Sequence, residues 1–203
     1  MKIAIIGATG RVGTRLIDEA LRRGHAVTAI ARQAEKLPAR QGLATRNADV
    51  ADAPALASAL AGHDVAISTV RFLQTSAAQI VGAVKAAAVP RLLVVGGAGS
   101  LYVAPGAQLV DTPQFPEAYK AEALAGRDFL NALRAETTLD WTFLSPAALF
   151  EPGTRTGAYR VGKETLLSDA SGKSWISMED YAIAMIDEVE KPAHSRQRYT
   201  VAY

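Results

Sequence analysis

Residues 1–13 read MKIAIIGATGRVG, a short apolar run that ends in a glycine-rich turn. The run 3–6 predicts a buried strand, and the glycines after it have the spacing G-x-x-G-x-x-G before a stretch of helical period. A pyrophosphate reaches backbone N–H groups at a helix N-terminus only where no side chain blocks it, so the turn needs glycine. The spacing alone is weak evidence, but its place between strand and helix predicts a dinucleotide site that includes Gly7, Thr9, Gly10, Arg11, Val12 and Gly13.

Beyond the turn, short apolar runs alternate with longer stretches of helical period through the first half of the chain. This alternation is typical of βα units, which build a parallel sheet covered by helices on both faces. The sequence therefore predicts an α/β fold of the Rossmann type with a doubly wound, mainly parallel sheet. Strands are expected at 3–6, 26–30, 43–45, 65–68 and 92–95, and helices at 11–23, 52–61 and 75–88.

The strict alternation stops in the last third of the chain. A long helix is expected over 117–135 and a strand over 141–144, followed by a glycine-rich, polar stretch at 151–174. Ser177 opens a last helix with a capping-box pattern in which Asp180 replaces the usual Glu, and 199–201 predict a final strand. We expect one domain, with a nucleotide-binding core at 1–145 and, over 146–203, a small C-terminal cap on the substrate side together with the last helix and strand.

The composition excludes several classes of chemistry. The chain has 203 residues, no cysteine and three histidines, which excludes thiolate nucleophiles and cysteine-ligated metals and leaves little for a histidine metal site. A formal net charge of +2 without a basic block does not favour nucleic-acid binding. No apolar run is long enough for a signal peptide or a membrane span, so we expect a cytoplasmic protein with no metal and no membrane partner.

The choice between NAD and NADP is made at the end of the second strand. About 20 residues beyond the glycine turn, an acidic side chain would bind the ribose 2′-hydroxyl of NAD. This place holds Arg32, and no acidic residue appears before Glu35. Arg32 and Arg11, with Lys36 as a third candidate, would pair with a 2′-phosphate, so we expect NADP(H) to be preferred over NAD(H). The alternative is that Arg32 is a solvated loop charge.

Other strand ends complete the predicted cofactor site. Asp49 and Val50 follow the third strand, where contacts to the adenine edge are expected, although Asp49 could equally cap the next helix. The remaining predicted cofactor residues are Ser68, Thr69 and Gly97.

The motifs GATGRVG at 7–13, Asp49-Val50 and GGAGS at 96–100 resemble those of the atypical short-chain dehydrogenase/reductase superfamily. More narrowly, the chain is similar to the compact NAD(P)H-binding branch that includes NmrA-like proteins and the biliverdin-IXβ/flavin reductase. The similarity covers the whole chain, including Ser145-Pro146 and the stretch 176–182. The resemblance implies a Rossmann fold and an NAD(P)H-dependent reductase.

The chain departs from the superfamily at the proton donor. Standard members carry Tyr-x-x-x-Lys, whose spacing places both side chains on one helical face. Here Tyr119 and Lys120 are adjacent and cannot form that pair. The remaining catalytic candidates are Ser100, which matches the family serine in place, and Tyr102 in the same loop, with Lys120 for the nicotinamide ribose. The alternatives are that Ser100 only shapes the turn, that Tyr102 only packs, and that Lys120 is a solvated lysine.

A pocket for a small-molecule substrate is expected after the strand at 141–144, from Ser145, Pro146 and Phe150. We expect hydride transfer from NADPH to a flat acceptor such as a quinone, a flavin or a carbonyl compound, because solvent can protonate quinones and flavins. A catalytically weak NADP(H)-sensing regulator of the NmrA-like type is the alternative, and a nucleotide-sugar epimerase or dehydratase is a third. A homodimer is left open, and His63, at the opposite end of the sheet, is assigned no chemistry.

Overall fold

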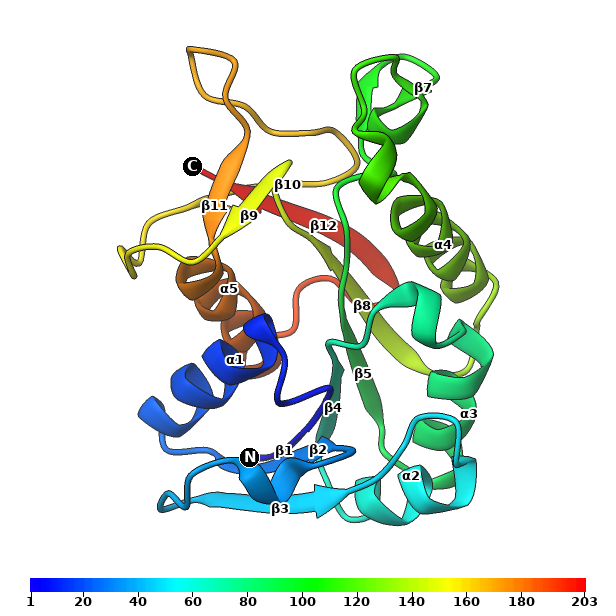
Figure 1. Ribbon diagram of the computed structural model, residues 1–203, viewed down its shortest axis with the longest axis vertical. Coiled ribbons are helices and arrows are strands. Elements are labelled where there is room, and N and C mark those ends of the chain that lie inside the picture. Colours follow the sequence, from blue (N-terminus) through cyan, green and yellow to red (C-terminus); the bar gives the residue numbers. More distant parts are fainter.

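The computed structural model describes all residues, 1–203, and its centre is one eight-stranded sheet (Figure 1). The strand order is β10-β12-β8-β5-β4-β1-β2-β3, and every neighbouring pair is parallel except β10 with β12. The predicted doubly wound, mainly parallel α/β sheet is therefore confirmed. The strands are β1 (Lys2–Ile6), β2 (Ala26–Ala31), β3 (Leu43–Asn47), β4 (Val65–Ser68), β5 (Arg91–Val95), β8 (Asp140–Ser145), β10 (Arg160–Gly162) and β12 (Gln197–Ala202).

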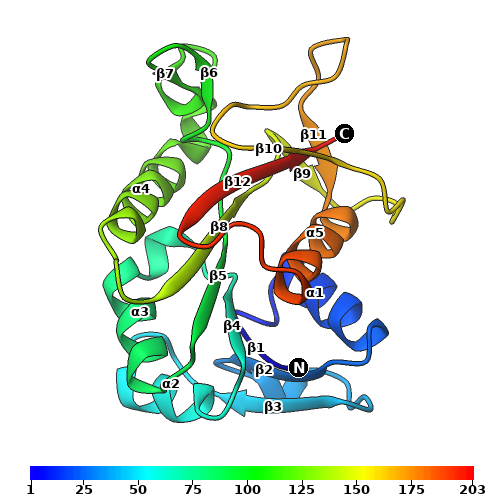
Figure 2. The same cartoon turned by 180° about the vertical axis from the view of Figure 1, so that it is seen from behind.

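Helices cover both faces of the sheet (Figures 1 and 2). On one face α1 (Arg11–Arg22) packs beside α5 (Met178–Glu190), and the other face carries α2 (Ala53–Leu60), α3 (Ala77–Ala86) and α4 (Glu117–Arg134). Three short 3-10 turns, η1 (Ala34–Lys36), η2 (Phe72–Gln74) and η3 (Leu109–Asp111), lie in the connections. No helix combines the length and the apolar character that crossing a membrane requires.

The sheet separates two hydrophobic clusters, as the period of a strand requires. Ile3 and Ile5 of β1 contribute to the cluster under α1 and α5, whereas Ala4 and Ile6 contribute to the cluster under α2, α3 and α4. All four side chains are at most 1% exposed, which explains why the central strand is a continuous apolar run rather than an alternating one.

The side of the sheet on which successive strands are added changes at β1. From β1 the chain first adds β2 and β3 on one side, and then β4, β5 and β8 on the other. Open α/β sheets bind ligands outside the carboxyl ends of their strands at such a point of reversal. The fold therefore places the crevice beside the turn that follows β1.

Two small sheets lie outside the main one. The pair β9 (Leu149–Glu151) and β11 (Trp175–Ser177) is parallel, and the hairpin β6 (Tyr102–Ala104) and β7 (Ala107–Gln108) is antiparallel. Figures 1 and 2 show both at the end of the molecule that is remote from β3. The sequence did not predict these strands or β10, because each has only two or three residues, too few to show the alternation that marks a strand.

The start of α5 differs in part from its predicted capping box. The Ser177 hydroxyl accepts a hydrogen bond from the Asp180 amide at 3.0 Å, as expected of an N-cap. The Asp180 carboxylate does not return the bond. It accepts instead from the Thr156 and Gly157 amides at 2.8 and 2.9 Å and from the Thr156 and Tyr203 hydroxyls. Asp180 therefore fixes the 154–158 loop rather than closing the cap.

Candidate cofactor site and the acceptor side

The glycine turn after β1 is too tight for any other residue. Gly7 has a φ of +80°, and a Cβ atom placed on it would lie 2.6 Å from the Thr69 hydroxyl oxygen. A Cβ atom on Gly13 would lie 2.7 Å from the carbonyl oxygens of both Gly7 and Ala8. The turn therefore packs so closely against the loop after β4 and against the start of α1 that no Cβ atom fits at either glycine.

The N-terminus of α1 offers unused hydrogen-bond donors. Gly10 is the N-cap and supplies no side chain, and the first turn contains no acidic residue. The Thr14 amide, which donates to the Gly10 carbonyl at 3.0 Å, is the first amide of this helix to find an acceptor, so the amides of residues 11–13 stay free. Free N–H groups and the positive end of the helix dipole fit the pyrophosphate of a dinucleotide.

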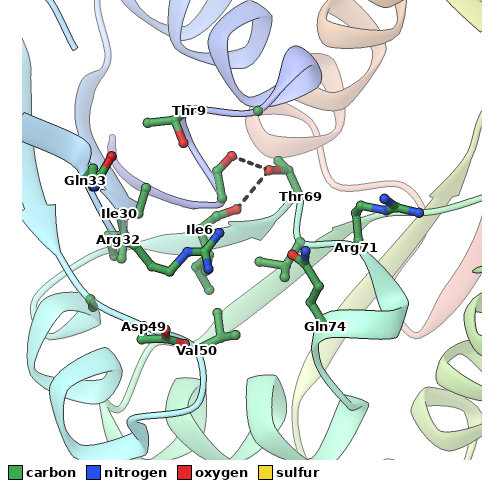
Figure 3. Close-up of a pocket in the computed structure, with 15 residues that line it drawn as sticks. Ile6, Thr9, Ile30, Arg32, Gln33, Asp49, Val50, Thr69, Arg71 and Gln74 are labelled. Atoms are coloured by element: carbon green, nitrogen blue, oxygen red, sulfur yellow. Dashed lines mark hydrogen bonds between the residues drawn. The ribbon is translucent and has the colours of Figure 1, made fainter. Parts of the chain in front are cut away.

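A pocket of about 730 Å³ opens in front of this turn (Figure 3). It is bounded by the carboxyl ends of β1, β2 and β3 and by the loop that follows β4. This is the crevice expected from the reversal of strand order. Its lining residues are Ile6, Gly7, Thr9, Gly10, Ile30, Ala31, Arg32, Gln33, Ala48, Asp49, Val50, Thr69, Val70, Arg71 and Gln74.

The structure brings many of the predicted cofactor residues together in this pocket and leaves others outside it. Those that line it are Gly7, Thr9, Gly10, Arg32, Asp49, Val50 and Thr69. Arg11, Val12, Gly13, Ser68 and Gly97 do not line it. Ser68 is the last residue of β4 and only 2% exposed, so direct contact of its side chain with a cofactor has no support from the pocket geometry.

Arg32 is exposed and extends from the end of β2 into the pocket (Figure 3). Asp49 faces the same space from the end of β3. The Asp49 carboxylate accepts from the Ala51 amide at 2.9 Å, whereas Asp52 caps α2 by accepting from the Ala55 amide at 3.0 Å. The alternative that Asp49 is the helix cap is therefore wrong, and Asp49 stays at the pocket.

The loop after β4 contributes residues that the sequence analysis missed, among them Arg71 and Gln74. No motif marks them. The register pairs Ile6 of β1 with Ser68 of β4, so the residues that follow both strands meet at the same edge of the sheet. The signal that could have indicated Arg71 and Gln74 is their place in the chain, directly after a strand that lies next to β1 in the sheet. The other lining residues that were missed are Ile6, Ile30, Ala31, Gln33, Ala48 and Val70.

The predicted acceptor residues lie beyond this pocket and are mostly buried. Ser100 is 4% exposed, Ser145 is fully buried and Pro146 is buried. Phe150 is half-buried, and its ring centre lies 4.7 Å from that of Tyr181. Tyr102 is half-buried in β6. None of these residues lines the 730 Å³ pocket.

Tyr119 and Lys120 lie in the first turn of α4 and do not line the nucleotide pocket. Tyr119 is 68% exposed, and the Lys120 ammonium lies 3.7 Å from the Glu117 carboxylate. His63 has partners of its own, since its ring nitrogens lie 2.8 Å from the Leu60 carbonyl oxygen and 2.7 Å from the Thr28 hydroxyl. No group of three or more acidic or histidine side chains is placed to hold a metal ion.

Comparison with known proteins agrees with this geometry. A family model described as NAD(P)H-binding matches residues 7–192. The chain belongs to this NAD(P)H-binding family. One relative of this chain is the uncharacterized protein YwnB of Bacillus subtilis, which is 42% identical to it. The match covers 99% of this chain and 98% of the length of YwnB.

Two solved structures resemble this NAD(P)H-binding protein along its whole length. A candidate epimerase from Bacteroides thetaiotaomicron is 44% identical with a TM-score of 0.94, and the match covers 100% of this chain and 96% of the other. A candidate NADH-flavin reductase from Streptococcus pneumoniae is 36% identical with a TM-score of 0.87, and the match covers 100% and 99% of the two chains. The resemblance to the NAD(P)H-binding branch that the motifs indicated is thereby confirmed.

Proposed function

We propose that this protein is a cytoplasmic NADP(H)-dependent oxidoreductase that reduces a small flat acceptor, a quinone, a flavin or a carbonyl compound. The observation that carries the proposal is the presence of Arg32 in the nucleotide pocket, at the strand end where an NAD-specific site places a carboxylate. The likeness to a candidate NADH-flavin reductase supports the class of reaction.

The residues of the pocket, together with the start of α1 beside them, fit the parts of a dinucleotide. The free amides at the start of α1 would bind the pyrophosphate, and Asp49 with Val50 would contact the adenine. The Arg32 guanidinium would pair with the 2′-phosphate, and Arg11, exposed at the first position of α1, is a second candidate for this pairing. When bound, the nicotinamide supplies the hydride, and the protein supplies orientation.

On the acceptor side we assign Ser100 and Tyr102 to the acceptor, with Ser145, Pro146 and Phe150 forming the wall around it. Ser100 follows β5 and Ser145 ends β8, and these strands are neighbours in the sheet. We keep Lys120 as the candidate for the nicotinamide ribose. A quinone or flavin suits this site because solvent can protonate it, so that no positioned tyrosine–lysine pair is needed.

A second function, an NADP(H)-sensing regulator, is favoured by one observation. Tyr119 is largely exposed and Lys120 pairs with Glu117, so the residues at the start of α4 supply no tyrosine–lysine pair at the pocket. A regulator would bind the cofactor tightly and turn over no acceptor.

The experiment is a titration of the purified protein with NADPH and NADH, followed by NADPH oxidation with menadione, FMN and an aromatic aldehyde. We expect tighter binding of NADPH and turnover with menadione or FMN. Tight binding without turnover on any acceptor would contradict the reductase and support the regulator. Conversion of a nucleotide sugar, added as a further arm because of the candidate epimerase, would overturn both.

A further inference from the structure

Arg198 is a fully buried arginine that no motif indicated. It lies in β12, and its side chain is 0% exposed. A guanidinium stays charged in a protein, and burying it is costly unless its donors find partners. The partners of the Arg198 guanidinium therefore indicate what its burial is for.

Arg198 lies near the start of β12, and its guanidinium reaches the carboxyl end of the neighbouring strand β8 and the loop that follows β5. Its Nη1 lies 3.3 Å from the Ser145 hydroxyl at the end of β8 and 3.4 Å from the Ser100 hydroxyl after β5. Its Nη2 donates to the Ser100 carbonyl oxygen at 3.2 Å. Both serines are residues that we assign to the acceptor side.

Arg198 also holds the segment that carries Tyr102. Its Nη2 donates to the Glu164 carboxylate, which pairs with Arg134 of α4 at 2.8 Å as well. The Tyr102 amide donates to the Glu164 carbonyl oxygen at 2.9 Å, and the Leu166 amide donates to the Tyr102 carbonyl oxygen at 2.9 Å. One ion pair thus ties the loop of Ser100 and Tyr102 to the main sheet.

The chemistry of the guanidinium decides which group donates and which accepts in each of these hydrogen bonds. A guanidinium has only donors, so toward Arg198 both serine oxygens act as acceptors and each hydroxyl keeps its own proton to donate elsewhere. The Nε of Arg198 is buried without a partner, so not all of its donors are satisfied. A cation behind a serine hydroxyl strengthens that hydroxyl as a donor, because charge-assisted bonds polarise their neighbours.

We propose that Arg198 is the positioning residue of the acceptor site: it fixes the Ser100 hydroxyl as a hydrogen-bond donor and, through Glu164, holds Tyr102 beside it. The class of acceptor that this arrangement suits has a carbonyl oxygen that gains negative charge when it is reduced, as quinones and flavins have. The inference rests on the proposed reductase function and adds the group that orients its acceptor.

The first test compares Arg198→Lys, Ser100→Ala and Glu164→Gln with a matched control, Thr200→Val. Thr200 lies two residues along β12, its buried hydroxyl has no partner, and valine has the same shape. For the first three variants we expect the KM for menadione or FMN to rise about tenfold or more while the Kd for NADPH stays within about twofold, a split that loss of stability alone does not produce. The control should change neither value.

The second test does not depend on turnover. Hydrogen exchange at the Tyr102 and Leu166 amides should become about tenfold faster in Arg198→Lys and Glu164→Gln, with exchange in β4 unchanged. If the wild type reduces no acceptor, the proposed function fails, and this measurement still decides whether Arg198 holds the loop. Unchanged exchange at both amides, or a folded Arg198→Lys with the KM of the wild type, would overturn the proposal.

Discussion

The Thr69 hydroxyl lies 2.9 Å from the Gly7 carbonyl oxygen and 3.0 Å from that of Ile6, and it thereby joins the loop after β4 to the turn after β1. These two segments are 62 residues apart in the chain, and together they form one wall of the nucleotide pocket. The pocket therefore depends on a contact that leaves no room for a side chain at position 7.

Replacing Gly7 by alanine should damage both stability and cofactor binding. The new Cβ would lie 2.6 Å from the Thr69 hydroxyl oxygen at a φ of +80°, so the loop after β4 must move. Strain of this kind costs on the order of 1–3 kcal/mol. Thermal unfolding and an NADPH titration would measure the two effects. Thr69→Ser, which keeps the hydroxyl, is the control; a Gly7→Ala protein that binds NADPH like the wild type would contradict the close approach.

Replacing a second glycine, Gly126 in α4, by alanine should destabilise the protein, although helix propensity alone favours alanine. In an exposed helix interior, alanine is more favourable than glycine by about 1 kcal/mol. Here a Cβ would lie 2.8 Å from the Phe72 ring, whose turn η2 leads to Gln74 at the pocket. Overpacking costs roughly 1–3 kcal/mol, so we expect Gly126→Ala to lower the melting temperature and weaken NADPH binding. Gly82→Ala in α3, where a Cβ meets nothing within 4 Å, is the matched control and should be neutral or stabilising.

Tyr102→Phe tests whether the phenol takes part in the reaction. If Tyr102 gives a proton, its loss should slow reduction of an aldehyde by about 100-fold while reduction of FMN changes little, because solvent can protonate the flavin. Steady-state kinetics with both acceptors would measure the ratio. An equal effect on both acceptors would show that Tyr102 only packs, the alternative that its sequence position left open.

Acid should destabilise the protein through Asp180. Burial by itself would raise the pKa of the Asp180 carboxyl, but hydrogen bonds from Thr156, Tyr203 and Gly157 outweigh it and hold this pKa below the usual 3.8. A carboxyl with a lowered folded-state pKa stabilises the fold fully above its unfolded value, and that stability is lost as the pH falls through the folded value. The free energy of unfolding should therefore hold from neutral pH down to about pH 5 and decline below about pH 4.

Asp180→Asn provides the comparison. The variant should be less stable than the wild type by about 1–3 kcal/mol at pH 7. The reason is that the NH2 group of asparagine replaces one carboxylate oxygen that accepts hydrogen bonds. The gap between the two proteins should narrow as the pH falls below 4. Denaturant unfolding at several pH values measures it, and a gap that stays constant down to pH 3 would rule out this role for Asp180.

The central sheet and the nucleotide turn were predictable because their signals are local. The run Ile3–Ile6 and the glycines after it depend on neighbours in the chain, so residues 1–13 already contain the strand, the turn and the helix start. The Ser177 cap was predicted only in part, since the Asp180 carboxylate is taken by Thr156 and Tyr203. Whether a side chain closes a capping box depends on such distant partners.

The acceptor side was less predictable because its contacts are long-range. Arg198 meets Ser145 and Ser100 across 53 and 98 residues, and nothing near it in the sequence marks a buried cation. Arg71 was missed for a similar reason, because its place at the pocket follows from β4 lying next to β1. Sheet order, rather than any motif, brings these residues to the site.

The preference for NADPH over NADH is the central claim, and Arg32→Asp tests it most directly. Losing a charge-assisted contact with the 2′-phosphate should weaken NADPH binding by about 10- to 100-fold while NADH binding stays within about threefold. Arg46→Asp makes the same change of charge at an exposed residue of β3 that does not line the pocket, and should alter neither. Titration of the three proteins with both nucleotides gives the answer: a selective loss of NADPH affinity in Arg32→Asp is the predicted result, and an equal loss of both affinities, or of neither, would contradict it.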